Sequence, residues 1–313
     1  MIKMTEEKDL NFIPEIQEMM FGLGDCPNPL ESTAKVIEEI VLDQMHSILC
    51  QAEEISARRN AKIISPQDLL FLMRNDAVKL QRLINYLALK DQKSVFQNGL
   101  AFSSNGDVSV DGTTYMVSMQ SNRSQICIAY LKELGIDIST DPSKQIFDPV
   151  KIKRQMRADW MSKTLPPKLY AEYAKSRQLS FHGRFRKIQK FLDWISARHG
   201  ENIVPKLKTS THDILVYLAK ETIAQLLDLV FLLRQDKMAA PGNPYSKAVI
   251  MNAHSNLRKE VYGSNSRVES TSPVTPEEIR EVVRRYWSNQ LCPFGLFSRT
   301  FSRNIRNRVM ACY

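Results

Sequence analysis

The sequence predicts an all-α protein in which two matching three-helix units pair within one chain. Of its 313 residues, 43% are hydrophobic and 25% charged, which is enough apolar material for real cores. Two long amphipathic patterns, near residues 31–59 and 211–236, repeat the same apolar positions. A short helix with a clear start signal is predicted after each of them. The length also fits about two domains.

The first unit begins with a short helix and continues into a long one. An apolar stripe from Ile13 to Met20 ends at Gly22 and Gly24, which is a helix stop signal. From residue 31 to 59, apolar residues then recur at steps of three and four, with no glycine or proline between them. This pattern predicts one long helix with a single apolar face.

The second unit repeats this pattern. Adding 178 to the positions of Ile37 and Ile48 gives Leu215 and Leu226, and each other apolar position of the first long helix lands on an apolar residue. A short apolar stripe at residues 188–195 precedes the second long helix. Two amphipathic helices agree partly by chance, because both follow the same helical period.

The start signals of the last short helices are more specific. A hydroxyl residue, a proline and a carboxylate three residues after the hydroxyl occur at Ser65–Asp68 and again at Thr275–Glu278. In such a capping box the side chains and backbone amides of the first turn satisfy one another. The offset is now 210, so the second connection is longer by 32 residues.

The order short, long, short is that of the histone fold. A long helix of this kind cannot bury its whole stripe against its own short neighbours, so we expect the two units to pair face to face. The residues predicted to form this histone-pair interface are Met20, Ile37, Val41, Met45, Ile48, Leu69, Leu72, Leu215, Leu218, Leu226, Val230 and Ile279.

Four segments are expected along the chain. Residues 1–93 hold the first histone fold and an extra helix, and residues 94–164 form a partly disordered linker with a basic helix near 150–163. Residues 165–290 hold the second histone fold with a long loop at 237–274. Residues 291–313 form a basic tail. A hairpin signal at 110–113 and a short helix at 126–134 lie within the linker.

Charge is unevenly distributed. Residues 1–150 hold 14 Lys and Arg against 21 Asp and Glu, a net of −7, and residues 151–313 hold 29 against 13, a net of +16; together they give +9. A basic second half suggests an acidic or nucleic-acid partner, or a solvated basic linker helix. Weak direct contact with DNA would use residues 151–190, the tail, or Arg58, Arg59 and Lys62 after the first long helix.

Enzyme motifs are absent from the sequence. It has no phosphate-binding glycine loop, no HExxH and no GxSxG, and the five cysteines form no CxxC pair. His46 and His212 lie on or at the start of the predicted long helices without a partnered Cys or Ser, which is typical of structural histidines. We therefore expect no enzyme activity, no metal and no cofactor. With no apolar run of about 20 residues and no secretory signal, we also expect an intracellular protein without a membrane span.

One side of the second long helix carries a polar strip. Tyr217, Glu221, Gln225 and Asp228 follow one another at steps of four, four and three. The strip is either an ordinary solvated flank or an acidic docking surface for a basic partner, with Tyr217 as an anchor.

Several motifs resemble the Spt-three family of transcription initiation proteins. They are MMFGLGD at 19–25, IISPQDLLFLMR at 63–74, SRQLSF at 176–181, LAKETIAQLLD at 218–228 and IREVVRRY at 279–286. The first unit is also similar to the 18-kDa histone-fold subunit of TFIID.

The resemblance implies two paired histone folds in one chain. It also implies a nuclear co-activator subunit of the SAGA complex that binds the TATA-box-binding protein and delivers it to RNA polymerase II promoters. Other SAGA subunits, including histone-fold subunits, would be partners. A DNA-binding protein and a purely architectural subunit remain the alternatives.

The chain departs from histones at one position. Ala61 stands where histones usually have an arginine that clamps the later aspartate. Asp68 therefore needs another partner, for which Arg58 and Arg59 are the candidates.

Overall fold

The computed structural model describes residues 10–103, 123–182, 188–199, 207–238, 272–291 and 310. Every regular element in these ranges is a helix, apart from one isolated bridge between Ile64 and Leu207. The all-α prediction is therefore confirmed. The predicted hairpin at 110–113 lies outside the described residues, as do most of the loop at 237–274 and of the tail.

The described helices group into two compact units whose boundary falls inside both long helices. The first unit comprises residues 1–47, 149–204 and 218–311, and the second comprises 48–148, 205–217 and 312–313. The division into 1–93, 94–164, 165–290 and 291–313 runs along the chain and stays a prediction. None of the described helices is long and apolar enough to cross a membrane.

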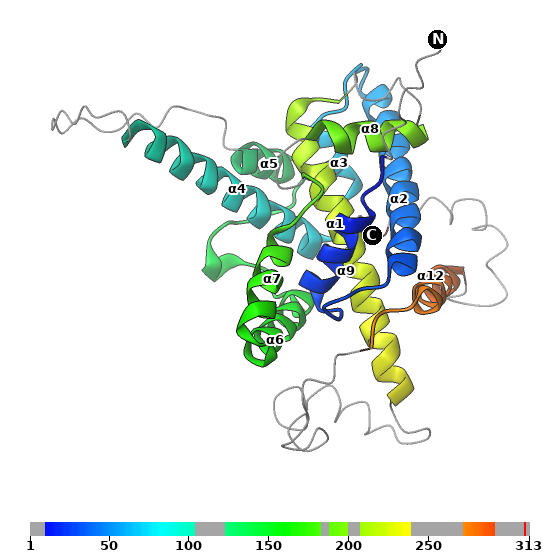
Figure 1. Cartoon of the computed structure of the whole chain (residues 1–313). Helices are drawn as coiled ribbons and strands as arrows, with labels where there is room; N and C mark the ends of the chain where they lie inside the picture. Colours follow the sequence, from blue (N-terminus) through cyan, green and yellow to red (C-terminus); the bar gives the residue numbers. More distant parts are fainter. Residues whose placement is uncertain are drawn as a thin grey trace, which may run out of the picture. The chain divides into compact units, whose positions relative to one another are not determined.

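Helices α1, α2 and α3 form the first short–long–short series (Figure 1). They span Ile13–Leu23, Glu31–Arg58 and Pro66–Leu72, close to the predicted bounds. Helix α1 ends at Gly24, whose φ of 115° is left-handed and thus suits a residue without Cβ.

Helices α8, α9 and α12 form the second series, at Ile188–His199, Thr209–Met238 and Pro276–Leu291. Most of the longer connection between α9 and α12, residues 239–271, lies outside the described ranges. The repeat found in the sequence therefore corresponds to a repeated order of helices.

Further helices separate the two series. Helix α4 spans Ala77–Ser103, so the predicted linker begins inside a helix and not in a disordered segment. Helix α5 spans Arg123–Glu133, close to the short helix expected there, and a 3-10 turn, η1, follows at Pro142–Lys144. Helices α6 and α7 span Pro149–Thr164 and Pro167–Gln178, and α6 is the basic helix predicted near 150–163.

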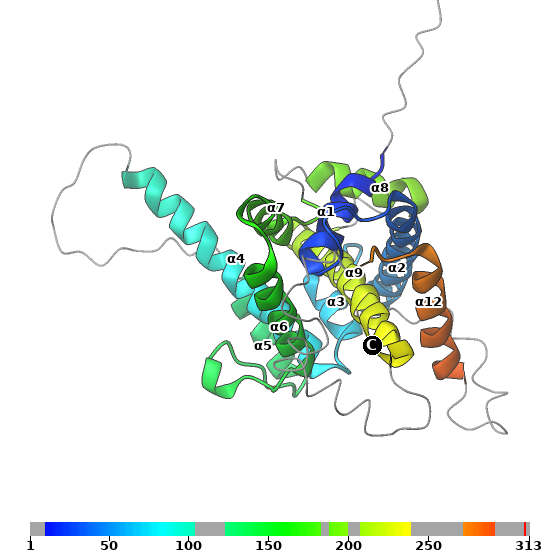
Figure 2. The same cartoon turned by 60° about the horizontal axis from the view of Figure 1, so that its bottom comes forward.

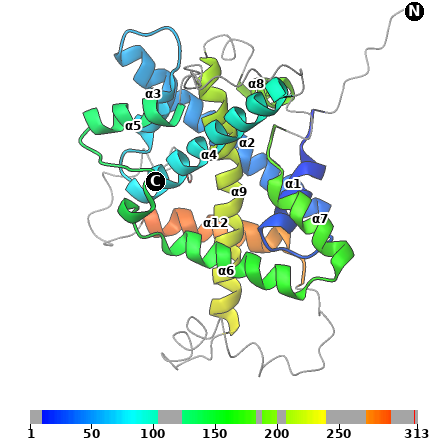
Figure 3. The ribbon, with the colours of Figure 1, turned by 90° about the vertical axis from the view of Figure 1, so that its left-hand side faces the viewer.

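The first half of α2 and the second half of α9 belong to the first unit, where they lie next to each other. Figures 1 and 2 show them side by side, and Figure 3 shows α9 passing across α2. This crossing agrees with the face-to-face pairing expected from the sequence. All the predicted interface residues are buried, with at most 5% of the surface of any one exposed.

Aromatic side chains from distant parts of the sequence fill one side of the first unit. Phe12 packs edge-on against Phe181 and Trp194, with ring centroids 5.2 and 5.0 Å apart. The Glu38 carboxylate on α2 accepts hydrogen bonds from the Phe12 amide at 2.6 Å and from the Trp194 indole at 3.2 Å. The aromatic rings are thus buried while the amide of Phe12 and the indole N–H of Trp194 keep a hydrogen-bond acceptor.

A glycine allows α1 and α7 to approach closely. A Cβ atom on Gly22 would lie 2.7 Å from the backbone carbonyl of Ser176. Beside this contact, Phe21, Tyr173 and Met161 form a small apolar cluster that joins α1, α6 and α7. The C-terminal end of α6 is therefore fixed by apolar packing.

Candidate protein-docking site on the second long helix

The polar strip of α9 is less exposed than its sequence suggests. Glu221 is only 6% exposed, and Gln225 and Asp228 are half-buried. The expectation of a solvated flank is therefore wrong for Glu221. Helix α6 accounts for this, because it brings two arginines onto the strip.

Arg154 of α6 holds both acidic residues of the strip. Its two terminal nitrogens donate to the two carboxylate oxygens of Glu221 at 2.9 and 3.1 Å, and its Nε donates to Asp228 at 2.7 Å. A guanidinium matches a carboxylate in this two-bond geometry, which a lysine cannot reproduce. Arg154 therefore acts as a bridge between two turns of α9.

Arg157 completes the contact one turn further along α6. Its Nη2 donates to the second oxygen of Asp228 at 2.6 Å, and its guanidinium lies 4.6 Å from the centre of the Phe231 ring. Cation–π contact adds to the ion pair at this distance. The two carboxylates of the strip are thus bound by two cations of the same chain.

Opposing effects act on Arg154. Burial disfavours the charged guanidinium, but the charges and hydrogen bonds of Glu221 and Asp228 outweigh burial and raise the pKa of Arg154. The guanidinium therefore remains charged throughout the physiological range.

Lys220, the neighbour of Glu221, fastens α9 to the end of α7. Its Nζ donates to the carbonyl oxygens of Arg177 at 3.1 Å and Leu179 at 2.5 Å. Burial, together with the positive charge of Arg177, lowers the pKa of Lys220 to about 8. A cation placed on the last carbonyls of a helix stabilises that helix end.

Tyr217 belongs to the second unit, where α4 covers it. Its ring lies 5.0 Å from the ring of Tyr86, whose pKa burial raises to about 12. One turn before Tyr217, Asp213 forms ion pairs with Lys90 at 2.5 Å and with Arg123. The predicted anchor thus already has an aromatic neighbour within its own unit.

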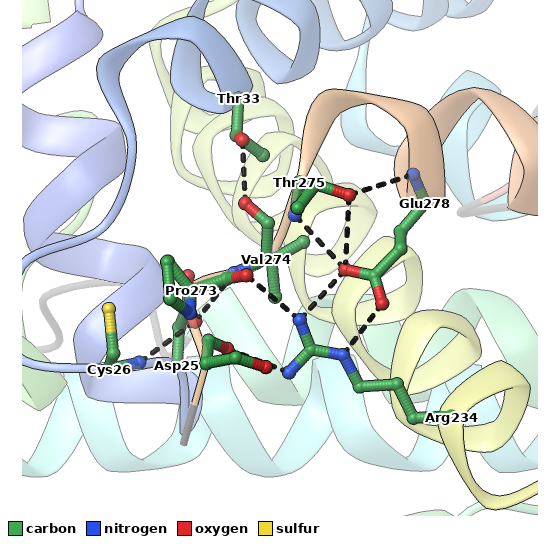
Figure 4. Close-up of polar contacts among 9 residues, drawn as sticks. Asp25, Cys26, Thr33, Arg234, Pro273, Val274, Thr275 and Glu278 are labelled. Carbon is green, nitrogen blue, oxygen red and sulfur yellow. Dashed lines mark hydrogen bonds and ion pairs between the residues drawn. The ribbon is translucent and has the colours of Figure 1, made fainter. Parts of the chain in front are cut away.

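Each unit contains one junction between a loop of the first series and a loop of the second. In the second unit, the Lys208 amide donates to the Ile64 carbonyl at 3.0 Å, and the Thr211 hydroxyl donates to the same oxygen at 3.2 Å. In the first unit, the Thr33 hydroxyl donates to the Val274 carbonyl at 2.6 Å (Figure 4).

The residues in these contacts are related by the same offsets, 178 and 210, that relate the two series in the sequence. Thr211 is Thr33 plus 178, and Val274 is Ile64 plus 210. The same buried threonine contact therefore occurs twice with the roles of the two series exchanged. This equivalence favours the predicted pairing of two histone folds.

The start of α12 carries an arginine clamp (Figure 4). Two nitrogens of Arg234 donate to the two oxygens of Glu278 at 2.8 and 2.7 Å, and its guanidinium also reaches the carbonyls of Ser272 and Pro273. The Thr275 amide donates to Glu278 at 3.0 Å, as the predicted capping box requires. Glu278 thus joins the end of α9 to α12.

Asp25 lies buried beside this clamp, with 1% of its surface exposed. Its Oδ1 accepts hydrogen bonds from the amides of Cys26 at 2.8 Å and Val274 at 3.1 Å, whereas its Oδ2 has no hydrogen-bond partner. Burial raises the pKa of Asp25, although the two amides and Arg234 oppose the shift.

The corresponding clamp in the second unit uses Arg59. Its Nη2 donates to Asp68 at 2.9 Å, and the Ser65 amide donates to the same oxygen at 2.7 Å. The partner predicted for Asp68 in the absence of an arginine at residue 61 is therefore confirmed as Arg59. Arg58 pairs with Glu54 instead, at 2.6 Å.

Sequence reasoning missed three functional features. It did not identify Arg154 and Arg157 as the partners of the strip, Arg234 as a clamp, or Asp25 as a buried acid. The i, i+3 spacing of the two arginines shows in the sequence that they share one face of the predicted basic helix, but it does not indicate which carboxylates they bind. Within the described ranges, no group of three or more His, Cys, Asp or Glu side chains could hold a metal ion.

Comparison with known proteins gives similarity along almost the whole chain. The family model for the 18-kDa subunit of transcription initiation factor IID matches residues 10–99. The SAGA complex subunit Spt3 of Drosophila melanogaster is 25% identical over 99% of this chain and 76% of that protein. The Schizosaccharomyces pombe protein of the same name is 28% identical over 67% of this chain and 71% of its own length. Subunit 13 of transcription initiation factor TFIID from Arabidopsis thaliana is 33% identical over 28% of this chain and 68% of that protein.

Proposed function

Because this chain belongs to the Spt3 family of transcription proteins, we propose that it is a non-enzymatic nuclear subunit of a SAGA-type co-activator complex. In this role it binds the TATA-box-binding protein and helps deliver it to RNA polymerase II promoters. Other SAGA subunits, including those with histone folds, are its further partners.

One observation carries this proposal: similarity to a protein named as a SAGA subunit extends over 99% of this chain. A shared histone fold alone would explain similarity only over residues 10–99, where the TFIID family model matches. The Drosophila melanogaster relative named Spt3 also aligns with the region that contains α6, α7 and the second series. The proposed role therefore belongs to the whole two-part chain.

The proposed docking surface is the strip of Glu221, Gln225 and Asp228, with Tyr217 as a further contact residue. Two carboxylates two turns apart on one helix bind guanidinium groups, and Arg154 demonstrates that fit within the chain itself. A basic surface on the TATA-box-binding protein would supply similar groups. Charge complementarity of this kind selects the partner and speeds association.

Two measurements test the proposal. The tagged full-length chain is purified from nuclear extract and its co-purifying proteins are identified; SAGA subunits in fixed stoichiometry are expected. Purified TATA-box-binding protein is then titrated against the purified chain. Absence of SAGA subunits, or of direct binding at micromolar concentrations, would refute the corresponding part of the proposal.

Direct DNA binding is the second candidate, and the junction in the second unit is the reason to consider it. Lys62 and Lys208 are exposed on either side of the contact between Ile64 and Leu207. Arg58 and Arg59 are already paired with Glu54 and Asp68. Phosphate binding would give a log-linear loss of affinity with salt, and absence of a duplex shift at moderate salt would eliminate this candidate.

A purely architectural role is the third. In that case, the SAGA-type complex fails to assemble when the chain is deleted. A variant of the chain that no longer binds the TATA-box-binding protein still supports both assembly of the complex and promoter delivery. Assembly without delivery would instead favour the leading proposal.

A further inference from the structure

We propose that α6 is an autoinhibitory element that occupies the acidic strip of α9 and competes there with the TATA-box-binding protein. This inference rests on the proposed function, because it concerns access to the same site. It follows from the finding that the two carboxylates predicted to bind a basic partner are bound by arginines of this chain.

The contact has the geometry expected of a tethered ligand. Arg154 and Arg157 lie one turn apart on α6 and together bind all four carboxylate oxygens of Glu221 and Asp228, through four hydrogen bonds of 2.6 to 3.1 Å. Both arginines are about one-fifth exposed. A basic helix from a partner could reach these carboxylates only after α6 has left.

The two ends of α6 are held by different forces. Its C-terminal end is fixed by Met161, which packs with Phe21 and Tyr173. The preceding turns face α9 through the two arginines, while Lys153, Gln155 and Met156 on the other faces are exposed. The N-terminal half is therefore attached mainly by ion pairs.

Ion pairs of this kind are exchangeable. An incoming basic surface replaces the charges that it displaces, so neither carboxylate is left buried without a partner. Release of Arg154 and Arg157 into water restores their hydration. Apolar packing around Met161 meanwhile keeps α6 attached, so that it can return to the strip.

A closed form lowers the apparent affinity for a competing partner by the fraction of molecules that are open. If about one molecule in ten is open, opening all of them raises the affinity about tenfold. Loss of the α6 contact should therefore raise the affinity for the TATA-box-binding protein. Loss of an ordinary stabilising contact would leave this affinity unchanged or lower it.

The test uses the full-length chain, purified TATA-box-binding protein and two double variants. Arg154→Ala with Arg157→Ala removes the clamp. Arg154→Lys with Arg157→Lys keeps both charges but loses the two-bond geometry, and so guards against a variant that fails to fold. Arg234→Lys is the matched control, because it weakens another arginine–carboxylate pair of the first unit without involving α6.

Two quantities are measured on each protein: the Kd for the TATA-box-binding protein, and amide hydrogen exchange at residues 150–157. We expect faster exchange and an affinity about tenfold higher for the alanine pair, a smaller gain for the lysine pair, and no gain for Arg234→Lys.

The possible outcomes separate the two proposals. In one outcome, the wild-type chain binds the TATA-box-binding protein and the opened variants bind it equally or more weakly, despite faster exchange in α6. The role of α6 is then purely structural, so the inference is refuted while the proposed function stands. If neither the wild type nor either opened variant binds, the proposed function itself fails and takes the inference with it. Binding by the opened variants alone supports both.

Discussion

Both loop junctions join a loop of the first series to a loop of the second, but they use different hydrogen-bonding groups. In the second unit, Ile64 and Leu207 meet as a short bridge of backbone hydrogen bonds. In the first unit, the amide of Val274 is bound by the buried carboxylate of Asp25. A repeat can therefore keep its helices while the connections between them diverge.

The clamps beside the junctions diverge in the same way. Glu278 is Asp68 plus 210, and both acids cap a short helix, but Arg59 and Arg234 do not lie at equivalent positions. Arg59 is 41% exposed, whereas Arg234 is 21% exposed and also binds two loop carbonyls. The first-unit clamp should thus contribute more to stability.

Removing the clamps should give the largest difference between the junctions. Arg234→Ala leaves Glu278 and two carbonyl oxygens without their cation, and we expect a loss of about 2 kcal/mol in unfolding free energy. Arg59→Ala should cost about 0.5 kcal/mol, because Asp68 keeps the Ser65 amide and the arginine is partly exposed. Chemical denaturation of the full chain measures both, and equal costs would contradict the proposed asymmetry.

The equivalent threonines allow a matched test of the repeat. Thr33→Val and Thr211→Val each remove one buried hydroxyl and leave a carbonyl oxygen with one bond fewer, at a cost of about 1 kcal/mol. The Thr33 bond is shorter, at 2.6 against 3.2 Å, so its loss should cost slightly more. If either variant is neutral in a denaturation experiment, the hydroxyl contact does not stabilise that junction.

Asp25 should make the first-unit junction depend on pH. Its pKa is raised above the ordinary value of 3.8 because burial penalises the carboxylate. The protonated form therefore contributes stability that is fully present below that ordinary value and is lost as pH rises through the raised folded-state value. The unfolding free energy of the wild type, taken relative to Asp25→Asn, should fall over that interval and level off above it. A constant difference between pH 3 and pH 8 would show that Asp25 does not titrate in this range.

The smallest effect is expected at the exposed cations of the second-unit junction. Lys62→Glu and Lys208→Glu should change the unfolding free energy by less than about 0.5 kcal/mol, because surface charges contribute little to stability. If DNA binding is real, the same changes weaken it and flatten its salt dependence. Unchanged duplex affinity would exclude this junction as a phosphate contact.

Local patterns in the sequence predicted the helices well. The three- and four-residue spacing located α2 and α9, and the capping boxes located the starts of α3 and α12, because these features depend on neighbours within a few residues. The sequence also narrowed the partner of Asp68 to two arginines, of which Arg59 is the one observed. The residues predicted to form the histone-pair interface are all buried, and the interface itself stays a prediction.

Partners that lie far apart in the chain were beyond local patterns. Charge counts identified an acidic strip and a basic helix, but nothing within a few residues of Glu221 indicated that Arg154, 67 residues away, would bind it. Burial of Asp25 likewise depends on Val274, 249 residues away. Contacts of this range form only when the packed helices bring distant segments together.

The sequence by itself determined the helices, their caps and the repeat, since backbone hydrogen bonding and apolar periodicity are local properties. The tertiary structure decided which charges are exposed and which are already paired. That outcome depends on which segments exclude water from one another, and here it turned a predicted open docking strip into one that α6 covers.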